Sequence, residues 1–174
     1  MSVTEKKQRP VFMIDNHPYV SSGIIVYTVD QQGVIYFLMQ RTYRGSWRYE
    51  DFGGKSEAGD ASLDDVAFRE FVEETNNHKD FPYDMIRAGM SHPGSRHCIP
   101  ECKYILYVVR VPASVYESVQ GLDFGDHETC DNIKRDVLWI SYKELFETPD
   151  AHIHPRIVSF KRDLPLELGA HGCV

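Results

Sequence analysis

The segment from Ser62 to Asn77 constrains the fold of this chain more than any other. Ser62 is a good helix N-cap, Asp65 follows three residues later as in a capping box, and acidic residues suit the first turn of a helix. Asn76 and Asn77 are typical of a helix end. Apolar residues cover more than one narrow stripe of the predicted helix, namely Leu63, Val66, Ala67, Phe68, Phe71 and Val72. Such a helix packs on more than one side, so we expect it to lie between two layers.

Runs of β-branched and aromatic residues predict strands around this helix. Residues 23–29 and 34–39 are expected to form a hairpin through a turn at 30–33. Further predicted strands cover 83–90, 103–111 and 136–140, predicted helices cover 141–147 and 155–162, and loops cover 41–50, 91–101 and 118–132. We expect residues 1–15 to form a flexible arm and residues 16–174 a single domain, because no repeat or linker divides them.

The 174-residue chain has a net charge of −7, and residues 50–74 carry all of this excess with nine acidic and two basic residues. Such a concentrated anionic segment is typical of a cation site. An acidic chain is a poor general binder of nucleic acid, so DNA is not expected as a partner. No apolar run approaches the ~18 residues of a membrane-spanning helix, and the polar start lacks a signal-peptide core. We therefore expect a cytoplasmic protein with no membrane partner.

Three glutamates, Glu70, Glu73 and Glu74, fall within about a third of the circumference of the predicted helix. Glu70 and Glu74 repel each other at i,i+4, and the helix dipole disfavours anions in these C-terminal turns. Arg69 alone does not neutralise three charges. A solvated acidic face is the plain alternative, but Glu70 and Glu74 border the apolar surface and are expected to be partly buried. A divalent cation such as Mg2+ or Mn2+ resolves these conflicts, and phosphoryl chemistry is its natural use.

The glycine pair Gly53–Gly54 precedes the acidic segment and lets the backbone approach a ligand closely. Gly-Lys-Ser-Glu-Ala-Gly-Asp at 54–60, then eight residues, then Arg-Glu-Phe-Val-Glu-Glu-Thr-Asn at 69–76 resembles the Nudix box. The pattern of that family is G-x5-E-x7-R-E-U-x-E-E-x-G-U, in which U is a bulky apolar residue. The hairpin before the box and the Trp139 strand after it are similar to the family as well.

The chain departs from the family pattern at several positions. Asp60 stands where the box has Glu, and eight residues instead of seven separate it from Arg69. Asn76 and Asn77 replace the late Gly and the final apolar residue, and Phe52 replaces a frequent Pro. The first two changes lie in the loop before the helix, and Asn tolerates the left-handed conformation that Gly supplies. We therefore expect catalysis to survive.

The resemblance implies an α/β fold, an α/β/α sandwich around a mixed β-sheet, and a Nudix pyrophosphohydrolase that acts on phosphoric anhydrides. It also implies that Mg2+ or Mn2+ binds the backbone carbonyl of Gly53 and the carboxylates of Glu70, Glu73 and Glu74. Arg69 would orient this cluster by pairing with Asp60 or a glutamate. The general base in the family is a box glutamate or an acid from a later loop, for which the candidates here are Asp126, Glu128 and Asp131.

Basic and aromatic residues just before the box are candidates for substrate binding. Arg41, Arg44 and Arg48 suit phosphate clamps, with a solubilising loop as the equal alternative. Trp47 suits stacking on a base, but a place in the core of a bent strand is the favoured interpretation for it. Lys55 suits a phosphate contact or simply balances the nearby acids.

We therefore expect Mg2+- or Mn2+-dependent hydrolysis of a nucleoside diphosphate linked to another group, by water attack on phosphorus, with a small nucleotide as substrate. One alternative is an RNA 5′-end hydrolase acting on a cap or triphosphate, which the acidic charge balance supports little. The other is a non-catalytic Nudix-fold module that binds nucleotides or regulates, against which the three intact glutamates argue. A homodimer stays open, and the leaving group is not readable from the sequence.

Overall fold

The structure is a computed structural model and describes residues 9–129 and 132–171. Its centre is a mixed seven-stranded sheet in the order β5–β4–β3–β8–β7, with β6 paired to β3 and β9 paired to β4. β3 and β8 are parallel, and the other pairings of this sheet are antiparallel. This topology places β3 and β9, which lie more than a hundred residues apart in the sequence, on the same sheet, since both pair with β4.

The described residues form the following elements. The strands are β1 (Phe12–Ile14), β2 (His17–Tyr19), β3 (Ser21–Val29), β4 (Ile35–Tyr43), β5 (Trp47–Glu50), β6 (Phe52–Lys55), β7 (Arg96–Ile99), β8 (Tyr104–Arg110) and β9 (Arg135–Ser141). The helices are α1 (Leu63–Glu74), α2 (Tyr83–Met90), α3 (Ala113–Val119), α4 (Tyr142–Glu147) and α5 (Pro155–His171), with single 3-10 turns at Pro100–Cys102 and Asp150–His152.

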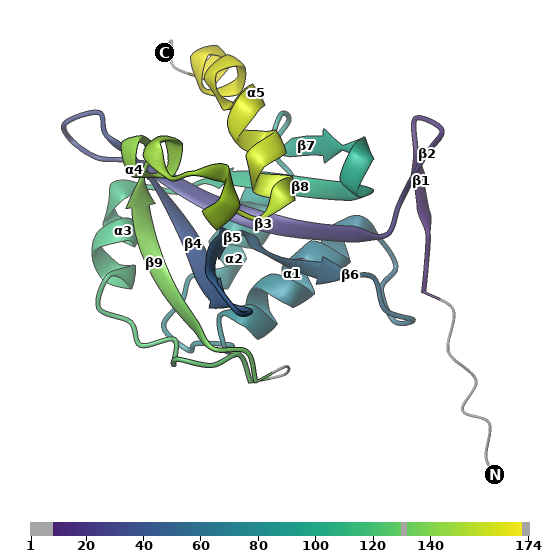
Figure 1. Ribbon diagram of the computed structural model, residues 1–174, viewed down its shortest axis with the longest axis horizontal. Coiled ribbons are helices and arrows are strands. Elements are labelled where there is room, and N and C mark those ends of the chain that lie inside the picture. Colours follow the sequence, from purple (N-terminus) through teal and green to yellow (C-terminus); the bar gives the residue numbers. More distant parts are fainter. Residues whose placement is uncertain (1–8, 130–131, 172–174) are drawn as a thin grey trace.

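Helices cover both faces of the sheet, so the expected α/β/α sandwich around a mixed sheet is confirmed (Figure 1). Alternate residues of β3 point to opposite faces. Ile24 and Val26 pack in the core that holds Phe71 of α1, whereas Ile25 packs in the core that holds Phe160 of α5. Helix α1 packs against β3 and β6 of the sheet and also contacts α2, so more than one side of it is covered, as its broad apolar surface predicted. No helix in the described part of the chain is long and apolar enough to cross a bilayer.

The strands expected at 23–29, 103–111 and 136–140 are confirmed with small shifts of their ends, as are the helices that begin after Ser62 and at Tyr142. The helix expected at 155–162 also begins as predicted, but it extends to His171. The strand expected at 83–90 is wrong, because this segment is helix α2. Ile86 and Met90, four residues apart, are both buried on one side of α2. That spacing belongs to a helix period rather than to the two-residue alternation of a strand.

Two predicted loops contain strands. The segment 41–50 extends the hairpin, since β4 runs on to Tyr43 and β5 begins at Trp47 after a turn in which Gly45 has φ 83°. The segment 91–101 contains β7, which pairs with β8. The N-terminal arm is also partly ordered, because β1 and β2 form a hairpin whose turn residues Asp15 and Asn16 both have positive φ. Residues 1–8 of that arm lie outside the described residues.

Candidate active site

Helix α1 carries the three glutamates. The Ser62 side chain accepts a hydrogen bond from the Asp65 N–H and starts the helix, and Asn76 and Asn77 follow its end with φ of 52° and 47°. The side chains differ in burial: Glu70 is 14% exposed, Glu73 is 38% exposed, and Glu74 is buried. The predicted partial burial of Glu70 and Glu74 is therefore confirmed, and Glu73 is the most accessible of the three.

Strand β6 brings the glycine pair against these carboxylates. A β-carbon added at Gly54 would lie 2.4 Å from the carboxyl carbon of Glu70, and one added at Gly53 would lie 2.0 Å from the Tyr104 hydroxyl. Position 53 therefore has no room for a side chain, since backbone atoms of Ser22 and Gly23 also lie within 2.6 Å of the added atom, whereas a side chain at position 54 would displace the Glu70 carboxylate. Burial raises the pKa of Glu70 to about 7, against the opposing effect of Arg69 and with smaller help from the charges of Glu73 and Glu128.

Glu74 is the most deeply placed carboxylate. Its Oε2 is buried and has no hydrogen-bond partner among the described residues. Burial raises the pKa of Glu74 well above its usual range, and the charge of Glu128 raises it further, while Gln40 and Arg156 act in the opposite direction. An orphaned buried carboxylate oxygen is costly unless something positive meets it.

Arg69 binds the acids on both sides of it. Its Nε and Nη2 donate to the two oxygens of Asp60 at 3.1 and 3.0 Å, and its Nη1 donates to Glu70 at 2.9 Å and to Glu73 at 3.2 Å. Burial alone would raise the pKa of Asp60, but the bonds from Arg69 and from the Glu57 N–H outweigh it and lower that pKa. The shorter Asp60 thus reaches Arg69 from a loop that is one residue longer than the family pattern.

Oxygen donors of this kind suit a hard divalent cation. Within the described residues, however, no three His, Cys, Asp or Glu side chains already converge as a preformed metal centre. These carboxylates do not converge because Arg69 forms ion pairs with Glu70 and Glu73. A cation therefore has to compete with this guanidinium for two of the three carboxylates.

The loop before β9 brings one candidate base to the glutamates. Glu128 is buried, and its charge acts on Glu70 and Glu74. Asp126 is exposed and pairs with His127, and Asp131 lies outside the described residues. The loop is anchored on the end of α1, because the Asn76 amide donates to the carbonyls of Phe124 and His127 at 2.6 and 3.2 Å. Its Oδ1 also accepts from the N–H and hydroxyl of Thr129.

Comparison with known proteins decides the family. The model of the NUDIX domain matches residues 17–160. The chain belongs to the Nudix family. This confirms the resemblance of the box and the expected enzyme class, a pyrophosphohydrolase. A search of curated protein sequences gave no match.

Solved Nudix structures share the fold. A C. elegans Ap4A hydrolase, solved as a binary complex, superposes with a TM-score of 0.52 at 13% identity, covering 86% of this chain and 97% of that one. The Nudix hydrolase RenU from M. smegmatis superposes with a TM-score of 0.50 at 10% identity, covering 92% and 96%. At such identities the likeness concerns the fold alone.

Four of the predicted substrate residues lie on the hairpin of β4 and β5 of this Nudix domain, and the fifth, Lys55, ends β6. The Arg41 guanidinium lies 4.9 Å from the centre of the Trp47 ring and pairs with Asp136 at 2.6 Å. Lys134 lies 5.8 Å from the same ring. The structure thus brings Arg41 and Trp47 together, and the partly exposed Trp47 is not a core residue. Arg44, Arg48 and Lys55 are exposed, and the side chains of these three form no ion pair with any described residue.

Sequence reasoning missed a buried cation beside the glycine pair. Arg156, in the first turn of α5, contacts Asp51, lies 3.6 Å from Glu50 and donates to the Gly53 carbonyl at 3.4 Å. Its guanidinium lies 4.8 Å from the centre of the Tyr104 ring, whose hydroxyl also donates to Asp51. No local signal marks this network, because Tyr104 and Arg156 lie 53 and 105 residues from Asp51 in the sequence.

Arg135 of β9 is a second missed cation. It is buried, and its Nε and Nη1 have no hydrogen-bond partner among the described residues. Burial lowers the pKa of Arg135, while the charges of Glu74 and Glu128 raise it. Arg135 therefore belongs to the inner end of the same acidic site. In the sequence it lies just before the strand predicted at 136–140, a position that does not predict burial of a charge.

Proposed function

We propose that this Nudix enzyme hydrolyses a nucleoside diphosphate linked to another group, with Mg2+ or Mn2+ bound at helix α1. The observation that carries the proposal is the pair Glu70 and Glu74. Both carboxylates have raised pKa values, and Glu74 has a buried oxygen without a partner. A divalent cation supplies the positive charge that these groups need to ionise.

The ligands of this cation would be the carboxylates of Glu70, Glu73 and Glu74 with the Gly53 carbonyl. When bound, such an ion stabilises negative charge on phosphate oxygens and makes water a better nucleophile at neutral pH. Arg69, tied to Asp60, keeps Glu70 and Glu73 in place on the helix. Glu128 is the proposed general base, because its carboxylate lies in the loop held by Asn76 and its charge reaches Glu70. It would take the proton of the attacking water.

The substrate is proposed to be a small nucleotide. Arg41 and the neighbouring Trp47 offer a cation and a flat aromatic side chain on the same hairpin, which suits a phosphate next to a base. Arg44, Arg48 and Lys55 add exposed positive charge for the phosphate chain. The similarity to an Ap4A hydrolase supports a dinucleoside polyphosphate as the first compound to test. We propose that residues 16–174 form the single domain that carries this activity.

The test is hydrolysis of a substrate panel with Mg2+, with Mn2+ and with EDTA. The panel holds dinucleoside polyphosphates, ADP-ribose, NADH, nucleoside triphosphates and capped RNA. We expect cleavage of a small nucleotide, and this cleavage should require the cation. Its rate should fall about a hundredfold in Glu73→Gln, since one charged ligand of the proposed cation is lost. The matched control is Glu117→Gln, because Glu117 is exposed on α3. This variant should cleave the substrate as the wild type does.

Each contrary outcome has a distinct meaning. Equal activity of wild type and Glu73→Gln would contradict the proposed role of Glu73 as a ligand of the cation. Preference for capped RNA would overturn the small-nucleotide substrate but keep the metal site. A folded wild type that cleaves nothing would favour a binding module instead.

A further inference from the structure

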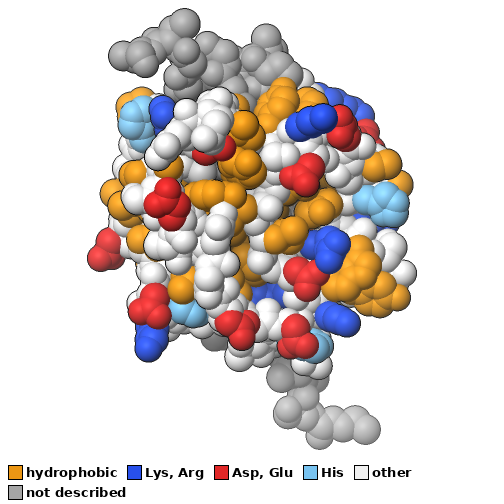
Figure 2. All heavy atoms as spheres, turned by 90° about the vertical axis from the view of Figure 1, so that its left-hand side faces the viewer, with side chains coloured by type: hydrophobic (Ala, Val, Ile, Leu, Met, Phe, Trp, Pro, Cys, Tyr) orange, Lys and Arg blue, Asp and Glu red, His pale blue; other side chains and the backbone are white. Residues whose placement is uncertain are grey.

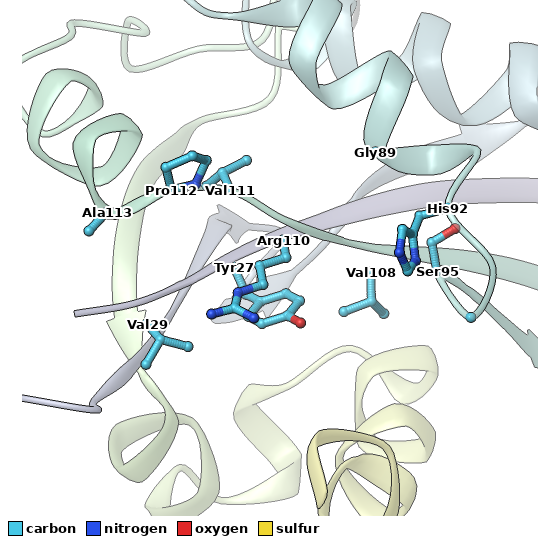
Figure 3. Close-up of a pocket in the computed structure, with 11 residues that line it drawn as sticks. Tyr27, Val29, Gly89, His92, Ser95, Val108, Arg110, Val111, Pro112 and Ala113 are labelled. Atoms are coloured by element: carbon cyan, nitrogen blue, oxygen red, sulfur yellow. The ribbon is translucent and has the colours of Figure 1, made fainter. Parts of the chain in front are cut away.

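A cavity of about 620 Å3 is lined by the C-terminal ends of strands β3 and β8 (Figure 3). The two strands pair in parallel from Ser21 opposite Tyr104 to Tyr27 opposite Arg110. At the N-terminal end of β3, Gly23 pairs with Gly53 beside the proposed metal site. Tyr27 is four residues further on, which is about 13 Å along a strand. A molecule in this cavity therefore does not touch the box glutamates.

The cavity opens where the sheet loses a strand. The last residue of β7 on this side, Arg96, pairs with Tyr107, and the Val108 N–H donates to the Ser95 carbonyl at 2.7 Å. β8 continues to Arg110 without a further strand on that edge. The Val111 N–H donates to the carbonyl of Tyr27 in β3, on the other side of β8. Because successive backbone groups of a strand point to alternate sides, the N–H and C=O of Arg110 face the unpaired edge.

Two polar side chains are directed into this space. Tyr27 is only 6% exposed, and its hydroxyl forms no hydrogen bond within the described residues. Burial raises the pKa of Tyr27, so the phenol keeps its proton and stays a donor at neutral pH, and the charge of nearby Arg110 lowers that pKa in part. The Arg110 side chain is exposed and forms neither an ion pair nor a hydrogen bond with any described residue. Figure 3 shows both side chains reaching into the cavity, with His92 and Ser95 across from them.

The rest of the wall is apolar and includes Val29, Val108, Val111 and Pro112. Among the described residues that line the cavity there is no Asp or Glu. The volume falls in the ordinary range of small-molecule sites, roughly 300–1,000 Å3. Figure 2 views the molecule at the end where the β3–β4 turn, α3 and α4 lie, and hydrophobic side chains form a band across this face between charged groups. A wall that combines apolar side chains with the polar groups of Tyr27, Arg110, His92 and Ser95 suits an anionic group on a compact body.

We propose that this cavity binds a small molecule through a phosphate or carboxylate group, with Arg110 and Tyr27 as the two side chains that hold the anion. The guanidinium offers a two-point, charge-assisted contact, and the phenol offers one further donor. The proposal does not depend on the activity proposed for the box, because the two sites share no residue.

The test follows the backbone amide of Arg110 by NMR while the full-length protein is titrated in EDTA. The probes are inorganic phosphate, adenosine 5′-monophosphate and benzoate, which separate phosphate from carboxylate carriers. We expect saturable binding of at least one probe and about tenfold weaker binding in Arg110→Met. Tyr27→Phe, which keeps the ring in the core, should weaken binding about threefold. The control Arg96→Met removes an exposed arginine from the neighbouring β7 and should bind as the wild type does.

Three results would overturn the proposal. One is a folded wild type that binds none of the probes at millimolar concentration. Another is binding that is unchanged in both Arg110→Met and Tyr27→Phe, because the anion then sits elsewhere. The third is equal weakening in Arg96→Met, which would indicate general attraction by surface charge. Thermal unfolding of each variant checks that it is folded, and no hydrolysis is measured, so failure of the box activity does not affect the outcome.

Discussion

The carboxylate of Glu70 occupies the space that a side chain at position 54 would fill. This close packing buries the Glu70 carboxylate, and burial raises its pKa to about 7. Glu74, one turn later, is shielded still more completely. At the scale of single residues the site therefore holds carboxyl groups that are protonated more readily than in water, and the proposed divalent cation would shift them back to the ionised form.

The metal-free protein should lose stability as the pH rises from about 5 to about 8. Glu70 ionises near its usual pKa of about 4.3 in the unfolded chain but near 7 in the folded one, so the folded state binds the extra proton between these values. Stability due to this proton is full below the lower pKa and is lost as the pH passes the upper one. Chemical denaturation in EDTA should show a smaller loss in Glu70→Gln, by about 1 kcal/mol or more.

Glu74 contributes in the same direction, so the slope should shrink in Glu70→Gln without vanishing. Glu117→Gln is the control and should keep the wild-type slope, because this side chain is exposed. An identical slope in Glu70→Gln and wild type would contradict the raised pKa of Glu70.

At the scale of elements, the end of α1 and the loop before β9 behave as one unit. Asn76 continues the chain in the left-handed conformation where the family pattern has glycine. Its side chain also forms four hydrogen bonds to residues 124–129, which a glycine does not offer. The departure from the pattern thus replaces a turn residue by one that both turns the chain and ties down the loop of Glu128.

Replacing this side chain should release the loop. Asn76→Gly keeps a residue that adopts positive φ and removes all four bonds, so we expect a loss of about 1–2 kcal/mol in unfolding free energy. Limited proteolysis should cut faster within residues 124–134, and kcat should fall if Glu128 is the base. Asn77→Gly is matched to it, since Asn77 is exposed, has φ 47° and makes no side-chain hydrogen bond to a described residue. Equal effects of the two changes would show that the backbone, and not the Asn76 amide, is what matters.

The elements that sequence reasoning identified are those with a complete local signal. Helix α1 has a cap, a stop and an apolar surface within one stretch, and β8 is a long run of β-branched and aromatic residues. The segment Tyr83–Met90 was misassigned because its eight residues carry only two buried apolar positions, too few to fix the period. The three glutamates were found because one helix holds them. Arg156, Arg135 and Gln40 were missed because only the folded sheet brings them to the site.

At the scale of the whole molecule, Arg156 links helix α5 to the central sheet. It lies at the start of α5 on one face of the sheet and contacts Asp51 in the segment between β5 and β6. Asp51 is fully buried and also accepts the Tyr104 hydroxyl. Pairing is thus the condition under which this acid is tolerated in the core.

Arg156→Met should destabilise the protein by about 3–5 kcal/mol, because it leaves a buried carboxylate without its cation. Chemical denaturation measures this loss. Adding Asp51→Asn to Arg156→Met should restore part of the stability, since the unpaired charge is then gone. Arg162→Met changes an exposed arginine further along α5 and should be close to neutral. A neutral Arg156→Met would mean that water or another group compensates Asp51.

The amide of Asn76 also has an evolutionary consequence. It joins the box to a segment about fifty residues away in the sequence, so neither partner is free to vary alone. Among relatives of this chain, asparagine at position 76 and a hydroxyl residue at position 129 should be gained and lost together. Lineages that keep glycine at position 76 should hold the same loop by other means, and an alignment of such relatives should show the two positions covarying as a pair.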